Sequence, residues 1–172
     1  MIARPLAAFL FALATLGMVG AATAQEIAGR VALQKGASVR VAGDQAQSLA
    51  LGAPIYAGDR ITTTEGARLR IAFEDGSELT LGEKAELTID AFVYRGNDQR
   101  QAMTMIAGAF RLATGLVGEL APQAVRLETP IAVIGIRGTD FIGGEFETGA
   151  PAGQRRYGFQ IREGAIEVAS PL

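Results

Sequence analysis

Apolar and polar residues alternate along much of this chain, and the clearest case covers residues 68–81. A period of two places every second side chain on the same face of a β-strand. The apolar positions of this segment are Leu69, Ile71, Phe73, Leu79 and Leu81. Asp75-Gly76 separates the two runs, and such a pair is typical of a tight hairpin, because glycine accepts the positive φ of these turns. The pattern therefore predicts a β-hairpin over 68–81.

The same period of two recurs in later segments. It covers Leu87, Ile89, Ala91 and Val93, then Val125, Leu127 and Thr129, and then Tyr157, Phe159 and Ile161. No window of about a dozen residues carries an apolar stripe at helical spacing. The 22 glycines tend to fall between the alternating runs. The predicted fold class is all-β, with many short antiparallel strands and hairpins in one compact domain that is either sandwich-like or a twisted β-solenoid.

The alternation also predicts which side chains form the core. The expected core residues are Leu69, Ile71, Phe73, Leu79, Leu81, Leu127, Ile131, Val133 and Phe159. Residues 115–123 include Pro122 and lack the alternation. They predict a short helical turn or an irregular cover over one end of the core.

The first 24 residues have the pattern of an export signal. Arg4 precedes an apolar run over 6–19, and Ala22-Thr23-Ala24 supplies small residues at the spacing a signal peptidase needs. The run is shorter than the ~20 residues that span a bilayer as a helix. We expect a signal peptide over 1–24, cleaved after Ala24, and one domain over 25–172; an uncleaved anchor is the alternative. No later segment predicts membrane insertion after cleavage.

The charge of the chain limits the classes of partner that it can bind. The chain has 16 basic and 18 acidic residues. Removing Arg4 with the signal leaves 15 against 18, a net charge of −3, which argues against a nucleic-acid partner because such partners need clustered basic surface.

Cysteine and histidine are both absent, which removes the commonest zinc ligands and the usual nucleophile–histidine pairs. No recognised spacing joins a serine to Lys35 or Lys84. The remaining carboxylate pairs, Asp75 with Glu78 and Glu145 with Glu147, are interpreted as solvated acids on turns or exposed strands. We therefore expect a protein that is not an enzyme, with no catalytic, cofactor-binding or metal site.

Residues 129–141 read T-P-I-A-V-I-G-I-R-G-T-D-F. This segment resembles the hallmark of the FecR domain family, which consists of periplasmic β-rich modules best known from bacterial cell-surface signalling. The matching residues are Thr129, Pro130, Gly135, Arg137, Gly138, Thr139 and Phe141. Three further segments resemble the family in the correct order, namely 51–63, 69–81 and 108–111 before the hallmark, and 163–168 resembles its closing strand. None of these motifs is catalytic in the family, so the resemblance implies strand and turn positions.

The best-known members of that family place a sigma-factor-binding domain in the cytoplasm, followed by a membrane helix. Here the export signal begins at residue 1, and the chain stops four residues after Val168. We therefore expect a stand-alone periplasmic module, with neither a cytoplasmic domain nor a C-terminal extension for a TonB-dependent receptor.

Arg137 and Gly138 admit two interpretations. In the favoured one, Gly138 supplies a turn and Arg137 is held inside the fold by carbonyls or a nearby acid. In the other, Arg137 is exposed and binds a carboxylate of a partner. Residues 145–156 contain turn formers and charges of both signs, and predict a plain surface hairpin, with an interaction loop as the alternative.

Two classes of function remain. The first is a non-enzymatic periplasmic module that acts in protein interaction or sensing in envelope signalling. The second is a module that binds an envelope ligand such as a glycan or cell-wall fragment. The absence of tryptophan and the presence of only three tyrosines disfavour a glycan site, because such sites usually display aromatic platforms. The partner itself is not identified by the sequence.

Overall fold

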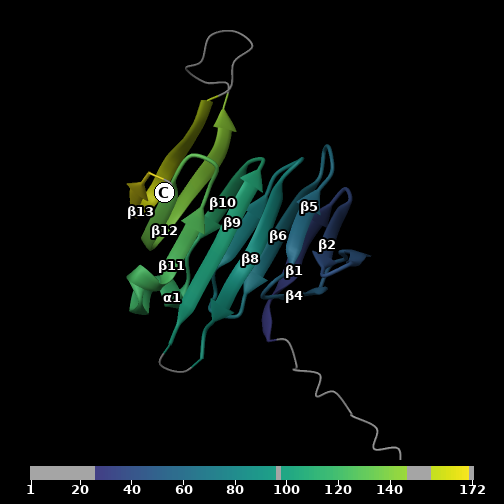
Figure 1. The fold of residues 1–172 in the computed structure, drawn as a ribbon, viewed down its shortest axis with the longest axis horizontal. Helices are drawn as coiled ribbons and strands as arrows, with labels where there is room; N and C mark the ends of the chain where they lie inside the picture. Colours follow the sequence, from purple (N-terminus) through teal and green to yellow (C-terminus); the bar gives the residue numbers. More distant parts are fainter. Residues whose placement is uncertain (1–25, 96–97, 147–155, 171–172) are drawn as a thin grey trace, which may run out of the picture.

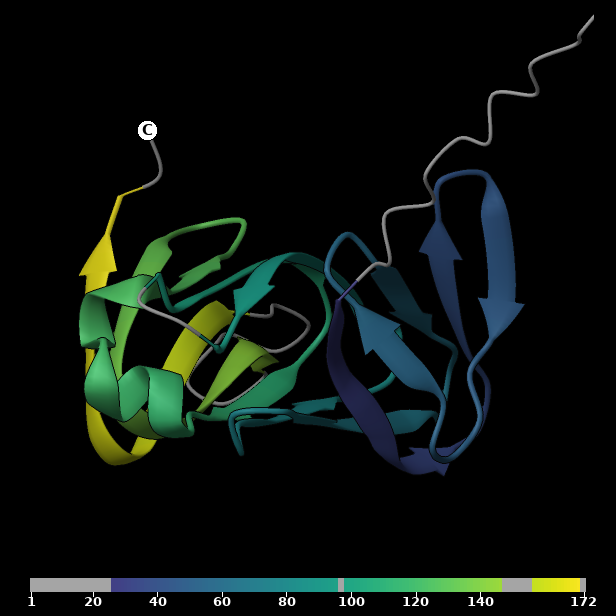
Figure 2. The same ribbon diagram turned by 90° about the horizontal axis from the view of Figure 1, so that it is seen from below.

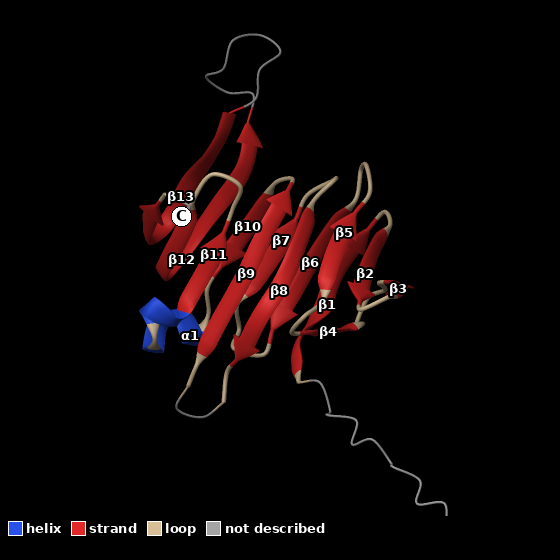
Figure 3. Cartoon of the chain, in the orientation of Figure 1, coloured by secondary structure: helices blue, strands red, loops and turns tan. Residues whose placement is uncertain are grey.

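The computed structural model describes residues 26–95, 98–146 and 156–170. The expected signal segment and most of the predicted 145–156 loop lie outside these residues. Within them the structure has thirteen strands, one short α-helix and one 3₁₀ turn (Figure 3). The elements are β1 (Ile27–Lys35), β2 (Ser38–Ala42), β3 (Gln45–Ser48), β4 (Pro54–Tyr56), β5 (Arg60–Thr63), β6 (Arg68–Phe73), β7 (Glu78–Leu81), β8 (Glu86–Val93), β9 (Arg100–Ala107), β10 (Phe110–Ala113), α1 (Leu116–Leu120), η1 (Pro122–Ala124), β11 (Val125–Glu128), β12 (Val133–Phe146) and β13 (Arg156–Ala169). The all-β prediction is confirmed.

The strands form one continuous sheet. Its order is β3-β2-β5-β8-β9-β11-β12-β10-β7-β6-β1-β4, and β13 pairs with β12 outside this path. The sheet curls, so that strands of its two halves contribute to one hydrophobic core, as Leu87 of β8 and Ile71 of β6 do (Figures 1 and 2). The pairs between neighbouring strands are antiparallel except for β9 with β11. The arrangement is closer to the sandwich-like alternative, with β12 joining its two layers.

The hairpin predicted over 68–81 is present as β6 and β7. Leu69 pairs with Leu81 and Ile71 with Leu79, and all four side chains are buried. Gly76 has a φ of +83°, as the turn requires.

Asp75, in the turn of that hairpin, is not the solvated acid that we expected. It is 2% exposed, and its Oδ1 accepts a hydrogen bond from the Ser77 amide at 3.0 Å while its Oδ2 accepts from the Ser77 hydroxyl at 2.7 Å. The Asp75 carbonyl also accepts a hydrogen bond from the Leu116 amide at 2.9 Å, and the Ser77 hydroxyl accepts one from the Gly115 amide at 2.9 Å. The Val117 amide of α1 also donates to the Asp75 Oδ2 at 3.3 Å, so the carboxylate ties the hairpin turn to α1, the short helical cover predicted within 115–123.

Strand β12 connects the two layers of the curled sheet. β11 pairs with residues 133–135 of β12, β10 pairs with residues 140–143, and β13 pairs along both halves. A strand has only two edges, so β11 and β10 share one edge in succession and β13 occupies the other. The register shifts between Arg137 and Asp140, where Gly138 has a φ of +56°. At residues 137–140 of the hallmark, β12 therefore passes from pairing with β11 in one layer to pairing with β10 in the other, and we call this branch point the fork.

Most of the predicted core is confirmed, but three residues are not in it. Leu69, Ile71, Phe73, Leu79, Leu81 and Leu127 are buried. Ile131 is 49% exposed and Val133 is partly exposed, while Ala132, Ile134 and Ile136 are buried instead. A turn at 129–132 separates β11 from β12 and reverses which alternate residues face the core.

Phe159 is only partly buried, because β13 has a neighbouring strand on one side alone. A bulge in β8 between Ile89 and Ala91 similarly ends the predicted alternation there, and Phe92 rather than Ala91 or Val93 is buried. The ring of Phe92 stacks on that of Phe73, with centroids 5.3 Å apart. Within the described ranges, no helix is both long and apolar enough to cross a bilayer.

Candidate interaction site

The hallmark begins with a side-chain-capped turn. Thr129 is buried, and its hydroxyl accepts a hydrogen bond from the Ala132 amide at 3.1 Å and lies 2.9 Å from the Ala132 carbonyl, to which it donates. The Thr129 amide donates to the same carbonyl at 2.8 Å. Pro130 and Ile131 form the exposed tip of this turn. Thr129 therefore sets the angle at which the chain enters β12.

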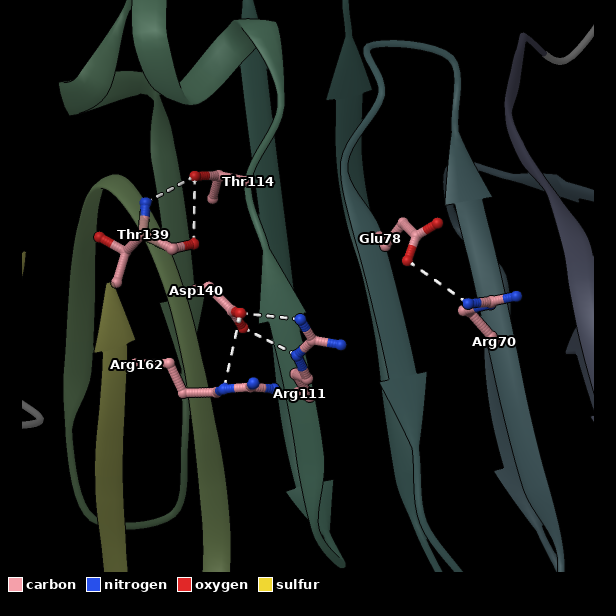
Figure 4. A network of polar contacts seen from close by, with 7 residues as sticks. All are labelled: Arg70, Glu78, Arg111, Thr114, Thr139, Asp140 and Arg162. Carbon is pink, nitrogen blue, oxygen red and sulfur yellow. Dashed lines mark hydrogen bonds and ion pairs between the residues drawn. The ribbon is translucent and has the colours of Figure 1, made fainter. Parts of the chain in front are cut away.

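Thr139 connects three segments at the fork (Figure 4). Its amide donates to the Thr114 hydroxyl at 2.9 Å, and its carbonyl accepts from the Thr114 amide at 3.0 Å. Its own hydroxyl donates toward the Ala165 carbonyl of β13 at 2.5 Å. Because Thr139 is 3% exposed, these bonds replace those that water would otherwise make. The residue holds β12 to the end of β10 and to β13.

Asp140 adds an ion pair just after the fork. The Nε and Nη2 of Arg111 donate to its two carboxylate oxygens at 2.8 and 2.7 Å, and Arg162 of β13 lies 3.8 Å away (Figure 4). The hydrogen bonds from Arg111 lower the pKa of Asp140, and the same bonds raise the pKa of Arg111. Asp140 therefore links β10, β12 and β13 through charge.

Phe141 anchors an aromatic cluster below the fork. It is fully buried, and its ring meets those of Phe110 and Phe159 edge-on at centroid distances of 5.6 and 6.4 Å. Tyr157 continues the row, 5.7 Å from Phe159. Burial raises the pKa of the Tyr157 hydroxyl to about 12, so this side chain stays neutral at physiological pH. Gly143 leaves room for the Phe110 ring, which an added Cβ would meet.

Arg137 differs from the other charged or polar members of the hallmark. Its side chain is exposed, and within the described parts of the chain it makes no hydrogen bond or ion pair. The favoured expectation, that carbonyls or an acid inside the fold hold this guanidinium, is wrong. The reason is its position on β12, where it faces outward opposite Ala165, a residue too small to cover it. Gly135, two residues earlier, faces the same way opposite Glu167.

Strand β13 next to the hallmark is the outer strand of the fork, and sequence reasoning did not identify its importance. Among the described strands it pairs only with β12, so one of its edges is unpaired over Arg156–Ala169 (Figure 1). Its core-facing side carries Phe159, Ile161, Ile166 and Val168. Ile161 is 47% exposed and Val168 is 53% exposed. The alternation of the sequence shows the length of this apolar stripe. It does not show that β13 has a neighbouring strand on one side alone.

The groups that this region exposes can form hydrogen bonds and apolar contacts. Within the described residues, no group of three carboxylate, histidine or cysteine side chains could hold a metal ion. The available groups are an unpartnered guanidinium, a row of backbone donors and acceptors, and a half-covered apolar stripe. Such groups bind other molecules through hydrogen bonds and burial.

Comparison with known proteins supports the family resemblance of the hallmark segment. No curated protein matches the chain. A solved structure described as a "Cell surface anchoring domain" is 26% identical, and the alignment covers 36% of this chain and 82% of that one with a TM-score of 0.35, too low to support an argument. The sequence model of the family described as FecR protein matches residues 59–167, more than half of the chain, and includes the hallmark strand. The chain therefore belongs to the FecR protein family.

Proposed function

We propose that this chain is a non-enzymatic protein-interaction module of the bacterial envelope, and that it acts as a sensory component of envelope signalling in the periplasm after cleavage behind Ala24. Membership of the FecR family supports the envelope setting. The observation that carries the interaction role is the unpaired edge of β13 with its half-covered apolar stripe.

The edge of β13 suits an extended segment of a partner protein. The outer edge of an antiparallel strand presents backbone N–H and C=O groups in alternation, and a partner strand can satisfy them by extending the sheet. A strand added beside β13 would also cover Ile161 and Val168, which now expose about half of their surface. Burial of the stripe gives affinity, while the backbone bonds fix direction and register.

Interruptions along β13 divide this edge into two usable stretches. The register with β12 shifts near Glu163, and Gly164 has a φ of +80°. Residues 156–161 and 165–169 remain regular on either side. Charged residues and bulges on edge strands discourage indiscriminate pairing. The proposed partner segment is therefore short or itself bent, which favours one specific partner over general aggregation.

Arg137 gives the site a charge-specific contact. It is exposed next to β13 and has no partner within the described residues, so its donors are free to bind a carboxylate of the incoming protein. This assignment gives a role to an arginine that stands in the hallmark and has no side-chain partner among the described residues.

Site-specific crosslinking tests the proposal in cells that produce the protein. A photoreactive amino acid replaces Val168 in one variant and Leu51 in another; Leu51 is 71% exposed and lies before β4, remote from β13 in the sheet order. We expect one envelope protein to crosslink at position 168 and not at position 51. A purified partner identified in this way is then titrated with the wild type and with Val168→Lys and Leu51→Lys.

Val168→Lys should weaken that complex by at least about tenfold, equivalent to ~1.4 kcal/mol, while Leu51→Lys leaves it unchanged. Arg137→Ala should weaken it without changing the melting temperature. Crosslinks only between copies of this chain would mean that β13 mediates self-association. Equal crosslinking at both positions, or equal loss of binding in both lysine variants, would contradict a specific interaction at β13.

A further inference from the structure

A groove of about 390 Å³ opens on the outer face of β6, β7 and β10, three strands that lie between β1 and β12. Its floor contains Gly82 and Ala109, which lie side by side because the Gly82 amide donates to the Ala109 carbonyl at 2.8 Å. Neither residue has a side chain larger than a methyl group. The sheet surface is therefore hollow at this point, while longer side chains surround it.

Three arginines line the groove. Arg68 and Arg70 lie two residues apart on the same face of β6, and Arg111 of β10 occupies the same register as Arg70, with Thr80 of β7 between them. No acidic residue is part of the lining, although the chain as a whole has 18 acidic residues against 16 basic ones. Glu78 and Asp140, which pair with Arg70 and Arg111, lie just outside this lining, so Arg68 is the lining arginine whose charge no acidic residue balances within the described chain.

Some donors of these arginines have no partner within the described residues. The Arg68 side chain is exposed and, within the described residues, makes no hydrogen bond or ion pair. Arg70 has only a loose ion pair with Glu78 at 3.7 Å, and its buried Nε has no hydrogen-bond partner. Asp140 engages two nitrogens of Arg111, which fixes the guanidinium, and the third nitrogen points away from Asp140 (Figure 4). The guanidinium of Arg68 and the third nitrogen of Arg111 are therefore open to an oxygen of a ligand.

We propose that this groove binds a small organic oxyanion, meaning a molecule that carries carboxylate or phosphate groups beside a short apolar part. Planar guanidinium groups match both anions through paired hydrogen bonds. Leu33 and Ile142 end the row that contains Arg70 and Arg111, and they would contact the apolar part. The volume fits a molecule of modest size. The proposal is independent of strand addition at β13.

Titration followed by NMR of the isotope-labelled protein tests it. The probes are succinate and inorganic phosphate, with succinamide as the matched neutral control. We expect succinate to produce saturable shifts at the amides of Gly82 and Ala109 and at the Nε resonances of the arginines, and succinamide to produce none. A response to succinate alone assigns a carboxylate ligand, and a response to phosphate alone assigns a phosphate ligand.

Variants locate the response. Arg68→Gln combined with Arg70→Gln should weaken binding at least about tenfold, whereas Arg95→Gln combined with Arg100→Gln removes the same charge from exposed positions outside the lining and should leave it unchanged. Arg68→Gln alone, at an exposed and unpaired position, retains the fold and should weaken binding severalfold. Equal responses to succinate and succinamide, no response to any probe, or equal weakening by both double variants would overturn the proposal.

Discussion

The β6–β7 hairpin and the β12–β13 hairpin are built on the same principle but behave differently. Both are antiparallel pairs with alternating apolar residues. The first lies in the interior of the sheet, between β1 and β10, and its inward side chains are fully buried. The second closes the fork, and its outer strand has a neighbour on one side only, so that strand leaves Ile161 and Val168 half exposed.

This difference shows what an alternating pattern measures. It reports which side chains share a face, and that face becomes core only if other elements cover it. Neighbouring strands and a facing layer supply the cover at β6–β7. Among the described residues β13 has no such cover, and the same pattern leaves apolar side chains half exposed.

The largest expected effect comes from truncating the interior hairpin. Phe73 is 4% exposed and stacks on Phe92, so Phe73→Ala should lower the free energy of unfolding by ~3–5 kcal/mol through lost burial and a cavity. Phe159→Ala on β13 should cost clearly less, because Phe159 is only partly buried. Urea unfolding of both variants measures the contrast, and equal losses would show that the two hairpins are equally part of the core.

The fork offers a matched pair of glycines. Gly138 and Gly164 both have positive φ, of +56° and +80°. An added Cβ at Gly164 would collide with the Gly138 carbonyl oxygen, whereas nothing lies within 4 Å of one at Gly138. We expect Gly164→Ala to cost ~2–3 kcal/mol and Gly138→Ala ~1 kcal/mol, the latter from backbone strain alone. Thermal unfolding of the two variants tests this order, which a greater loss at Gly138 would reverse.

Asp140 makes the stability of the fork depend on pH. The hydrogen bonds from Arg111 lower its pKa below the ordinary 3.8, so the ion pair stabilises the fold above that pH and the contribution disappears as the pH falls through the folded-state pKa. Because both side chains are partly exposed to screening solvent, Asp140→Asn should cost no more than ~1 kcal/mol at pH 7.

The difference in the free energy of unfolding between wild type and Asp140→Asn should therefore shrink at low pH. Glu78→Gln is the control, because its ion pair with Arg70 is loose and exposed, and it should have little effect at either pH. Unfolding curves at pH 7 and pH 2.5 measure both. A gap that persists unchanged at the lower pH would mean that the charge of Asp140 is not what stabilises the fork.

The smallest expected effect is at Arg137. Its exposed side chain has no partner within the described residues, so Arg137→Ala should change the free energy of unfolding by less than about 0.5 kcal/mol. Differential scanning calorimetry provides the measurement, and Thr139→Ala, which removes a buried hydroxyl, is the contrasting variant. A substantial loss at Arg137 would return this residue to a structural role.

Local sequence patterns suffice to predict the strand character of the chain, the hairpin over 68–81 and most of the core. These features depend on local alternation and on turn residues such as Asp75-Gly76, whose preferences act within a few positions. The FecR hallmark was also recognisable, because its turn and fork residues stand at fixed spacing. For the same reason Thr129, Gly138 and Thr139 could be singled out before their contacts were known.

Which faces of the strands are covered depends on contacts between distant segments. The turn at Thr129 and the bulge in β8 each shift the alternation by one residue, which moved Ile131 and Val133 out of the core and placed Phe92 inside it. Burial of Asp75, exposure of Arg137 and the free edge of β13 depend on which strands become neighbours across the curled sheet. That choice follows from contacts between segments far apart in the chain, and no local pattern encodes it.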